Sequence, residues 1–274
     1  MNVKFSCPVC GQELELQGKT YRCINNHCFD KAKQGYVNLL QSQKSSKKRH
    51  GDDSLMVKAR QDFLEKGYYN NLCAELVKAV SRNAVKDTVL IDLGCGECWY
   101  TAQIYKKLVQ DGKNPAVFGI DISKQAIIYG AKRCRELNLA VASTADIPMA
   151  DESCDIVVCV FAPYAESEVL RVLKRGGCFI KVFPLENHLM GLKKAIYDRP
   201  YKNEVNEETP EYFEKKDFVR ISNVIHLENN EDIINLFKMT PYYYKTGRDD
   251  QMKSQILQSL ETETEFGIVT YKKL

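Results

Sequence analysis

Residues 89–96 read Val-Leu-Ile-Asp-Leu-Gly-Cys-Gly, and this stretch decides the fold. An apolar strand-like run that contains Asp92 leads directly into Gly94 and Gly96, and a helical pattern follows. In open α/β sheets, glycines at this point let the backbone approach a ligand at the carboxyl edge of the strands. The stretch therefore predicts a strand of a doubly wound sheet with a ligand site at its end.

The same alternation of strand and helix continues along the chain. Strands are predicted over residues 116–121, 139–143, 155–161 and 177–183, and helices over residues 101–110, 124–137 and 166–173. Two helices precede the glycine stretch, over residues 54–66, where Ser54 is the expected N-cap, and over residues 71–83. Such alternation indicates parallel pairing and an α/β fold, with a late edge or antiparallel strand over residues 266–271.

Two more acidic residues follow predicted strands. Asp121 ends the strand after Asp92, where a carboxylate can accept hydrogen bonds from both hydroxyls of a ribose, and Asp146 follows the third strand. The glycine pattern lacks the third glycine that dinucleotide-binding enzymes place one helical turn later. It resembles class I methyltransferases, which use S-adenosylmethionine. A nucleotide-binding oxidoreductase and an inactive domain of the same fold are the alternatives.

The first 30 residues contain a metal-binding pattern. Cys7-Pro-Val-Cys10 and Cys23-Ile-Asn-Asn-His27 are separated by twelve residues, and each pair can supply two ligands of a tetrahedral zinc ion. Cys28 competes with His27 for the fourth position on spacing alone. Free thiols in a small hairpin are the alternative, but a module of this size has too little core to fold without a staple. Four protein ligands would make the site structural.

Charge and composition divide the chain into three parts. We expect a zinc-binding module over residues 1–40, a polar basic linker over residues 41–54 and a methyltransferase domain over residues 55–274. Residues 1–60 carry eleven Lys and Arg against five Asp and Glu, although the whole chain has a net charge of +3. A basic end suits a polyanionic partner, and a solvated linker is the alternative.

The expected location is the cytoplasm. The longest apolar run, near residues 156–162, is far short of the roughly 20 residues that a membrane helix needs. The first ten residues lack the basic and then apolar pattern of a signal peptide. Eleven cysteines, an odd number, argue against a complete set of disulfides, and most of those outside the N-terminal module fall in apolar stretches.

Several strings together resemble one family, the RlmA-type 23S rRNA (guanine-N1)-methyltransferases, which include the tylosin-resistance methyltransferases. The matching strings run from residue 5 to about residue 241: Phe5-Ser-Cys-Pro-Val-Cys10, Tyr21-Arg-Cys23, His27, Phe29-Asp-Lys-Ala-Lys33, Gly35-Tyr-Val-Asn-Leu-Leu40, Gly51-Asp52, Ala59-Arg60, Phe63-Leu64, Gly67, Tyr69, Asp92-Leu-Gly-Cys-Gly-Glu97, Ala162-Pro163, His188-Leu-Met190 and Met239-Thr-Pro241.

The resemblance implies a substrate, two bound groups and an assembly. It implies N1-methylguanine as product, in a hairpin of domain II of 23S rRNA, and homodimers whose zinc modules flank an RNA cleft. It places zinc on Cys7, Cys10, Cys23 and His27, which favours His27 over Cys28. It adds Tyr69, the Glu97–Cys98 turn and His188 to the cofactor site, beside Asp92, Gly94, Gly96, Asp121 and Asp146. One departure is Cys98, where the family usually has glycine; a side chain there could crowd the cofactor.

No residue is selected as the catalytic base. Guanine N1 must lose a proton near transfer, and Asp155 and Glu166 are candidate acceptors. The target base must be unpaired, and Phe161 and Tyr164 are candidates to stack on it. Tyr242-Tyr-Tyr244, Lys245 and Arg248 could form a second wall or a packed hinge. A small-molecule methyltransferase and a non-catalytic zinc-dependent RNA-binding protein are the competing functions.

Overall fold

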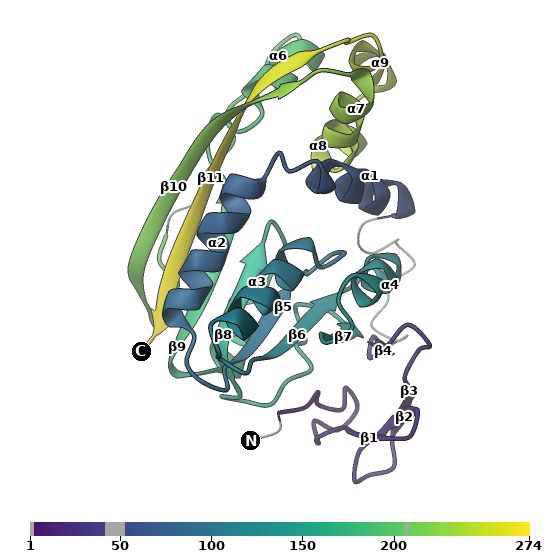
Figure 1. The fold of residues 1–274 in the computed structure, drawn as a ribbon, viewed down its shortest axis with the longest axis vertical. Coiled ribbons are helices and arrows are strands. Elements are labelled where there is room, and N and C mark those ends of the chain that lie inside the picture. The colour runs from purple at the N-terminus through teal and green to yellow at the C-terminus, as the bar shows by residue number, and fades with distance from the viewer. Residues whose placement is uncertain (1–2, 42–52, 206–207) are drawn as a thin grey trace.

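The computed structural model describes residues 3–41, 53–205 and 208–274. Its centre is an eight-stranded sheet in the order β10-β11-β9-β8-β5-β6-β7-β4 (Figure 1). The strands of this sheet are β4 (Val37–Asn38), β5 (Val89–Leu93), β6 (Ala116–Asp121), β7 (Asn138–Val141), β8 (Cys154–Val160), β9 (Leu173–Pro184), β10 (Phe213–Leu227) and β11 (Leu260–Lys273). The predicted α/β class is confirmed, and the basic segment at residues 44–49 lies outside the described residues.

Helices of the described residues alternate with the central strands along the sequence, and four more follow β9. They are α1 (Ser54–Glu65), α2 (Asn70–Asn83), α3 (Trp99–Gln110), α4 (Lys124–Arg133), α5 (Glu166–Val172), α6 (Met190–Ile196), α7 (Asn230–Lys238), α8 (Pro241–Lys245) and α9 (Arg248–Gln255). None of the helices in the described ranges is long and apolar enough to cross a membrane.

The central strands are parallel and buried on both faces. β5 pairs with β6 and β8, and every residue of β5 is buried, which explains its continuous apolar run. From β5 the chain passes to β6 and β7 on one side and returns to β8 and β9 on the other. The strand order therefore reverses between β5 and β8, and ligands of such sheets bind at the carboxyl edge of this switch point.

Different elements cover the two faces of the sheet. Leu90, Val117 and Val158 face a core shared with α2, α3 and α4. Ile91, Phe118 and Val157 face the opposite core, which contains residues of α5 and of the N-terminal module, among them Phe5 and Leu14. The N-terminal module therefore covers part of this face of the sheet, a position that helices occupy in other doubly wound sheets.

The N-terminal module is joined to the sheet by backbone and ring contacts. It has a small sheet of its own, β1 (Glu15–Gln17), β2 (Thr20–Arg22) and β3 (Cys28–Asp30), and β4 then pairs in parallel with β7. The Ser6 N–H donates to the Pro148 carbonyl at 2.8 Å, and the rings of Phe5 and Phe118 meet edge to face at 5.1 Å.

Four local expectations differ from the structure. The N-cap of α1 is Asp53, whose carboxylate accepts from the Met56 N–H, and Ser54 is the first helical residue. α4 ends at Arg133, four residues early. The strand expected over residues 177–183 begins earlier, at Leu173, and Gly176 and Gly177 lie in a bulge inside β9, where the pairing with β8 jumps from Leu173 to Cys178. The late strand is longer than expected, and as β11 it lies inside the sheet because β10 forms the edge.

Candidate functional site

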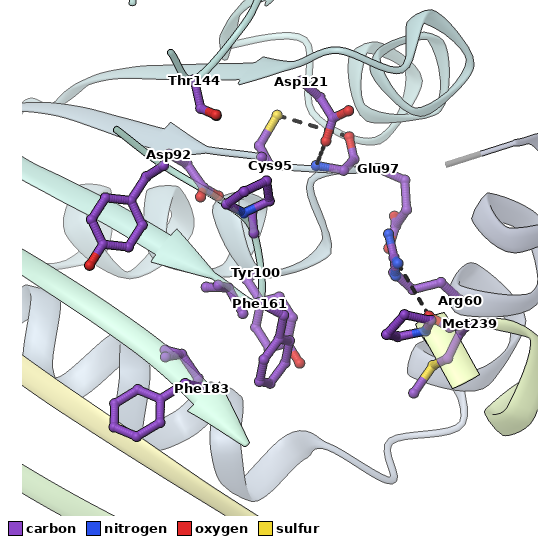
Figure 2. Close-up of a pocket in the computed structure, with 18 of the residues that line it drawn as sticks. Arg60, Asp92, Cys95, Glu97, Tyr100, Asp121, Thr144, Phe161, Phe183 and Met239 are labelled. Atoms are coloured by element: carbon purple, nitrogen blue, oxygen red, sulfur yellow. Dashed lines mark hydrogen bonds between the residues drawn. The ribbon is translucent and has the colours of Figure 1, made fainter. Parts of the chain in front are cut away.

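A cavity of about 870 Å³ opens at the carboxyl ends of β5, β6, β8 and β9, at the predicted switch point (Figure 2). Its volume suits a cofactor together with part of a substrate. Seven of the nine predicted cofactor residues line it: Tyr69, Asp92, Gly94, Gly96, Glu97, Asp121 and His188. The two others, Cys98 and Asp146, do not line it.

The glycine loop after β5 forms the floor of the cavity. Gly94 has a φ of +70°, and a Cβ there would lie 2.3 Å from the Cβ of Ala162, so only glycine fits. The N–H of Gly96 donates to the Asp121 carboxylate at 2.9 Å, and the other oxygen of Asp121 accepts from the Ser123 N–H at 2.7 Å. These bonds hold the ends of β5 and β6 together, with the carboxylate of Asp121 at the cavity.

Asp92 is a buried acid, and one of its two carboxyl oxygens has no hydrogen-bond partner among the described residues. Thr101 donates to its Oδ2 at 2.5 Å, while Oδ1 has no hydrogen-bond partner in the described part of the chain. Burial raises the pKa of Asp92 to about 7. A buried carboxylate in this state is poised to accept a hydrogen bond from a ligand, above all from a cation.

Two further polar atoms at the cavity lack partners. The hydroxyls of Tyr69 and Tyr100 are buried and make no hydrogen bond to any described residue. Buried polar groups are normally paired, because an orphaned donor costs about 1–3 kcal/mol. All three orphaned atoms belong to residues that line one cavity, so they fit a polar ligand such as S-adenosylmethionine, which carries an ammonium, a carboxylate and ribose hydroxyls.

His188 is buried on the same side as Tyr69. Its ring centroid lies 4.6 Å from that of Phe266 and 6.3 Å from that of Tyr69, and its Nδ1 accepts from the Glu265 N–H at 3.3 Å. Burial lowers the pKa of His188 to about 3. The ring is therefore neutral at pH 7 and carries its hydrogen on Nε2, so it can donate one hydrogen bond but cannot supply a positive charge.

Glu97 and Cys98, at the start of α3, both contact α4. The Glu97 carboxylate is buried and accepts from Arg133 at 2.7 and 2.8 Å, which ties the loop to α4. Cys98 is the N-cap of α3 with a φ of +61°, a left-handed backbone conformation that glycine adopts most easily. Its thiol is fully buried against Gly130, outside the cavity lining, so it does not crowd the cofactor space.

Asp146 lies beside the cavity. It lines a second hollow between the N-terminal module and the sheet, and this hollow shares Ile122, Ser143 and Ala145 with the first.

Arg60, Tyr100 and Lys181 also line the cavity, and none of them was among the predicted site residues. Arg60 donates to the Met239 carbonyl at 3.3 Å and closes the side opposite Phe183 (Figure 2). Tyr100 stands in the first turn of α3, directly after the loop. Lys181 carried a signal that could have been used, since it is a lone charge inside the apolar run Phe179-Ile-Lys-Val-Phe183.

The candidate stacking residues are placed at the cavity. Phe161 follows β8 with a φ of +58°, is 44% exposed and lies 5.5 Å from Phe266 between ring centroids. Tyr164 and Tyr242 also line the cavity, but Tyr243, Tyr244, Lys245 and Arg248 do not. Phe161 is therefore an open aromatic face beside the cofactor space.

Neither candidate base faces the cavity. Asp155 lies at the opposite end of β8, where it accepts from the Val89 N–H and pairs with Lys174 at 2.7 Å. Glu166 begins α5 and is exposed outside the lining. A sequence places such acids only near a strand or helix, and the end of the strand decides whether they reach the site.

The predicted metal ligands form one cluster. The ligand atoms of Cys7, Cys10, Cys23 and His27 all lie within 4.8 Å of one another. The Sγ atoms of Cys10 and Cys23 are 3.7 Å apart, and His27 Nδ1 is 3.4 Å from Cys23 Sγ and 3.6 Å from Cys7 Sγ. A tetrahedral zinc with Zn–S bonds of about 2.3 Å places its sulfur ligands about 3.8 Å apart, so the cluster fits zinc. Cys28 is exposed and lies outside it.

The fold and the two sites define the class of the protein: a class I methyltransferase domain that carries an N-terminal zinc ribbon. Family models agree with this class. Residues 5–48 match the zinc ribbon described as "RlmA, N-terminal", and residues 84–239 match a methyltransferase domain. The chain belongs to the RlmA family of 23S rRNA (guanine-N1)-methyltransferases.

Two relatives illustrate the membership. The chain is 33% identical over 193 residues to the 23S rRNA (guanine(748)-N(1))-methyltransferase of Streptomyces fradiae, across 69% of this chain and 66%, just under two thirds, of that protein. It is 30% identical over 255 residues to a Bacillus subtilis (strain 168) protein that carries a provisional name as a 23S rRNA (guanine-N(1)-)-methyltransferase, across 89% of this chain and 88% of the relative.

Proposed function

We propose that the chain transfers a methyl group from S-adenosylmethionine to N1 of a guanine in 23S rRNA. The observation that carries the proposal is the cavity itself, in which three orphaned buried polar atoms lie beside the open ring of Phe161. The first feature suits the cofactor and the second suits a base taken out of its stack. The names of the two relatives supply the identity of the base.

Different residues of the cofactor site suit different chemical groups of S-adenosylmethionine. The Asp121 carboxylate stands where it can accept from ribose hydroxyls, and the free Oδ1 of Asp92 suits an ammonium. The hydroxyls of Tyr69 and Tyr100 can donate to a carboxylate. When bound, the cofactor supplies an electrophilic methyl group on a positively charged sulfur.

The protein's task is to align N1 with that methyl group and to keep water out. Alignment of two reactants supplies much of the catalysis in a displacement that needs no covalent intermediate. Phe161 and Tyr164 can hold the base by stacking, since base–aromatic stacking contributes about 1–3 kcal/mol per base. Guanine N1 bears a hydrogen at neutral pH, and that proton leaves as the N1–C bond forms.

The finer points of the proposal rest on family membership. We propose a hairpin of domain II as the target, a cytoplasmic location with the ribosomal RNA, and a homodimer. We also propose that residues 1–40 form a structural zinc module, that residues 41–54 link it to the catalytic domain at residues 55–274, and that Gly94, Gly96, Glu97 and the buried His188 shape the cofactor site. Cys98 and Asp146 would act only from behind its lining.

One assay tests the reaction and its site. Purified protein is incubated with labelled S-adenosylmethionine and unmodified 23S rRNA, and the product is mapped by reverse-transcription arrest, because a methyl group on guanine N1 blocks Watson–Crick pairing. A single new arrest in domain II is the expected result. Cofactor binding without label in RNA would contradict the rRNA function and favour a small-molecule substrate, and loss of cofactor binding would favour a non-catalytic role.

A further inference from the structure

Lys181 is a half-buried cation on the wall of the cavity. It lies in β9 between the strands β8 and β11, where it pairs in register with Cys159 and Val269. Its Nζ is 5.4 Å from the ring centroid of Tyr164 and 5.3 Å from that of Phe183, and both residues also line the cavity. The ammonium therefore lies near two aromatic rings of the same cavity lining.

The ammonium of Lys181 lies near aromatic rings rather than beside a carboxylate. It makes no ion pair with a carboxylate in residues 3–41, 53–205 and 208–274, where many other lysines do, for example Lys66 with Asp232. Ring faces attract a cation but do not use up its N–H groups as acceptors do. Lys181 therefore keeps hydrogen-bond donors for a ligand in the cavity.

The other cationic side chain of the lining cannot take this place. Arg60 donates to the Met239 carbonyl, and its Nη1 would be 3.6 Å from a Cβ at Gly96, on the glycine-loop side of the cavity. Lys181 lies instead beside the ring of Tyr164, and the cavity lining that contains both residues also contains Phe161. Of the two cations, only Lys181 stands beside the surface on which the target base would stack.

We propose that Lys181 donates a hydrogen bond to O6 of the target guanine and stabilises the negative charge that N1 shares with O6 as its proton leaves. This inference rests on the proposed function. In the step, the N1–H bond breaks and the proton passes to water, the electron pair on N1 forms the bond to the methyl carbon, and the carbon–sulfur bond breaks with its pair remaining on sulfur. Lys181 keeps its proton throughout.

The same contact selects guanine. Adenine has an amino group where guanine has O6, so its N–H donors would face the N–H donors of Lys181, and two donors that face each other are both left unsatisfied. The structure thus assigns to one residue both a rate effect and a choice of base.

Two titratable groups that face Lys181 keep their protons near neutral pH. Burial raises the pKa of Cys159 on β8 and of Tyr164 to about 12 in each case, and Tyr271 on β11 lies near Tyr164. Asp92, with a pKa of about 7, belongs to the cofactor site, and an ammonium bound to it would lower this pKa below the range of the measurement. A pH profile between about 6.5 and 9.5 therefore reports on the loss of the N1 proton.

The first test compares Lys181→Met with Lys272→Met, an exposed lysine on β11 outside the lining. Saturating rates on the 23S rRNA substrate should fall by about 10²–10³-fold at pH 7 in the Lys181 variant, as when one preorganised donor to a developing negative charge is removed. The deficit should shrink as pH rises, because N1 then loses its proton without help. Lys181→Arg should recover part of the rate, and all three variants should bind S-adenosylmethionine as the wild type does, which shows that they fold.

The second test asks whether Lys181 touches O6 itself. A hairpin is synthesised with 6-thioguanine at the methylated position, since sulfur accepts hydrogen bonds weakly. Lys181→Met should cost much less on this hairpin than on the guanine hairpin, which is the non-additivity expected of groups in contact.

Three outcomes would be decisive against the idea. Equal losses on both hairpins, or weaker RNA binding with an unchanged saturating rate and pH profile, would overturn the role of Lys181 alone. No methyl group on guanine from the wild type would overturn the proposed function and this role with it.

Discussion

The thiol of Cys98 packs against Gly130 of α4, on the side of the glycine loop that faces away from the cavity. This relationship explains how a side chain is accommodated at position 98, where the resemblance to the family led us to expect glycine. We predict that Cys98→Gly changes the affinity for S-adenosylmethionine by no more than about threefold, well under 1 kcal/mol. Isothermal titration calorimetry measures it. A much larger gain in affinity would mean that the thiol reaches the cofactor after all.

A substitution at Gly130 tests the same contact from the other side. A Cβ at Gly130 would lie 2.5 Å from the Cys98 sulfur, so Gly130→Ala should destabilise the protein by about 1–3 kcal/mol through overpacking. Cys98→Gly in the same chain should restore most of that loss in urea unfolding. Strict additivity of the two changes would refute the contact.

Asp92 should make the cofactor-free protein less stable as pH rises. Its pKa is about 7 in the folded chain against an ordinary value of 3.8, so the folded state holds a proton that the unfolded state has lost between these pH values. Stability therefore falls from about pH 4 to about pH 7 and stays low above. Asp92→Asn should raise the free energy of unfolding by on the order of 2–4 kcal/mol at pH 8 and by less at pH 5.

The same substitution should weaken cofactor binding, because the amide cannot offer a negative charge to an ammonium. Urea unfolding at both pH values and calorimetric titration of S-adenosylmethionine check the two halves. A stability gain that is equal at pH 5 and pH 8 would show that Asp92 does not titrate in this range.

Removal of the Tyr100 hydroxyl, like the substitution of Asp92, should stabilise the cofactor-free protein and weaken cofactor binding. Its hydroxyl is buried without a partner among the described residues, so Tyr100→Phe removes a desolvated group and should stabilise the cofactor-free protein by about 1 kcal/mol. It should weaken S-adenosylmethionine binding by about tenfold, the value of one hydrogen bond. Tyr105→Phe, outside the lining, is the control. Unchanged affinity in Tyr100→Phe would remove the hydroxyl from the cofactor site.

Substitutions can distinguish the predicted zinc ligand His27 from the adjacent Cys28. His27→Ala should lower bound zinc below one ion per chain, because His27 Nδ1 stands in the cluster, whereas Cys28→Ser should retain one ion because its thiol is exposed outside. Metal content after dialysis against a weak chelator gives the comparison. Loss of zinc from the Cys28 variant alone would reverse the assignment.

Much of the fold follows from local pattern. The buried run of β5, the glycines that follow it and the return of apolar strands identify the parallel sheet, because such strands must be apolar on both faces. The zinc cluster follows from spacing because each pair of ligands sits on one short turn. The choice of His27 over Cys28 came from resemblance, and spacing alone could not make it.

Other features depend on contacts between distant residues. Spacing cannot show that Cys98 turns toward Gly130, or that Asp155 points to the wrong end of β8, because both depend on how the elements pack. Lys181 was visible as a charge in an apolar strand, yet only the sheet brings it beside Tyr164 and Phe183. The antiparallel edge, β10, depends on pairing with β11 rather than on a strong pattern of its own.

The pairing of β4 with β7 gives the zinc ribbon a protective role for the whole sheet. Val37 and Asn38 pair with Ala140 and Val141, and the Leu39 N–H donates to Val141 at 2.9 Å, so a two-residue strand closes that side of the sheet. If metal loss unfolded the ribbon, the backbone groups of β7 would be open to a strand of another molecule. Zinc depletion should then appear first as self-association of an otherwise folded catalytic domain.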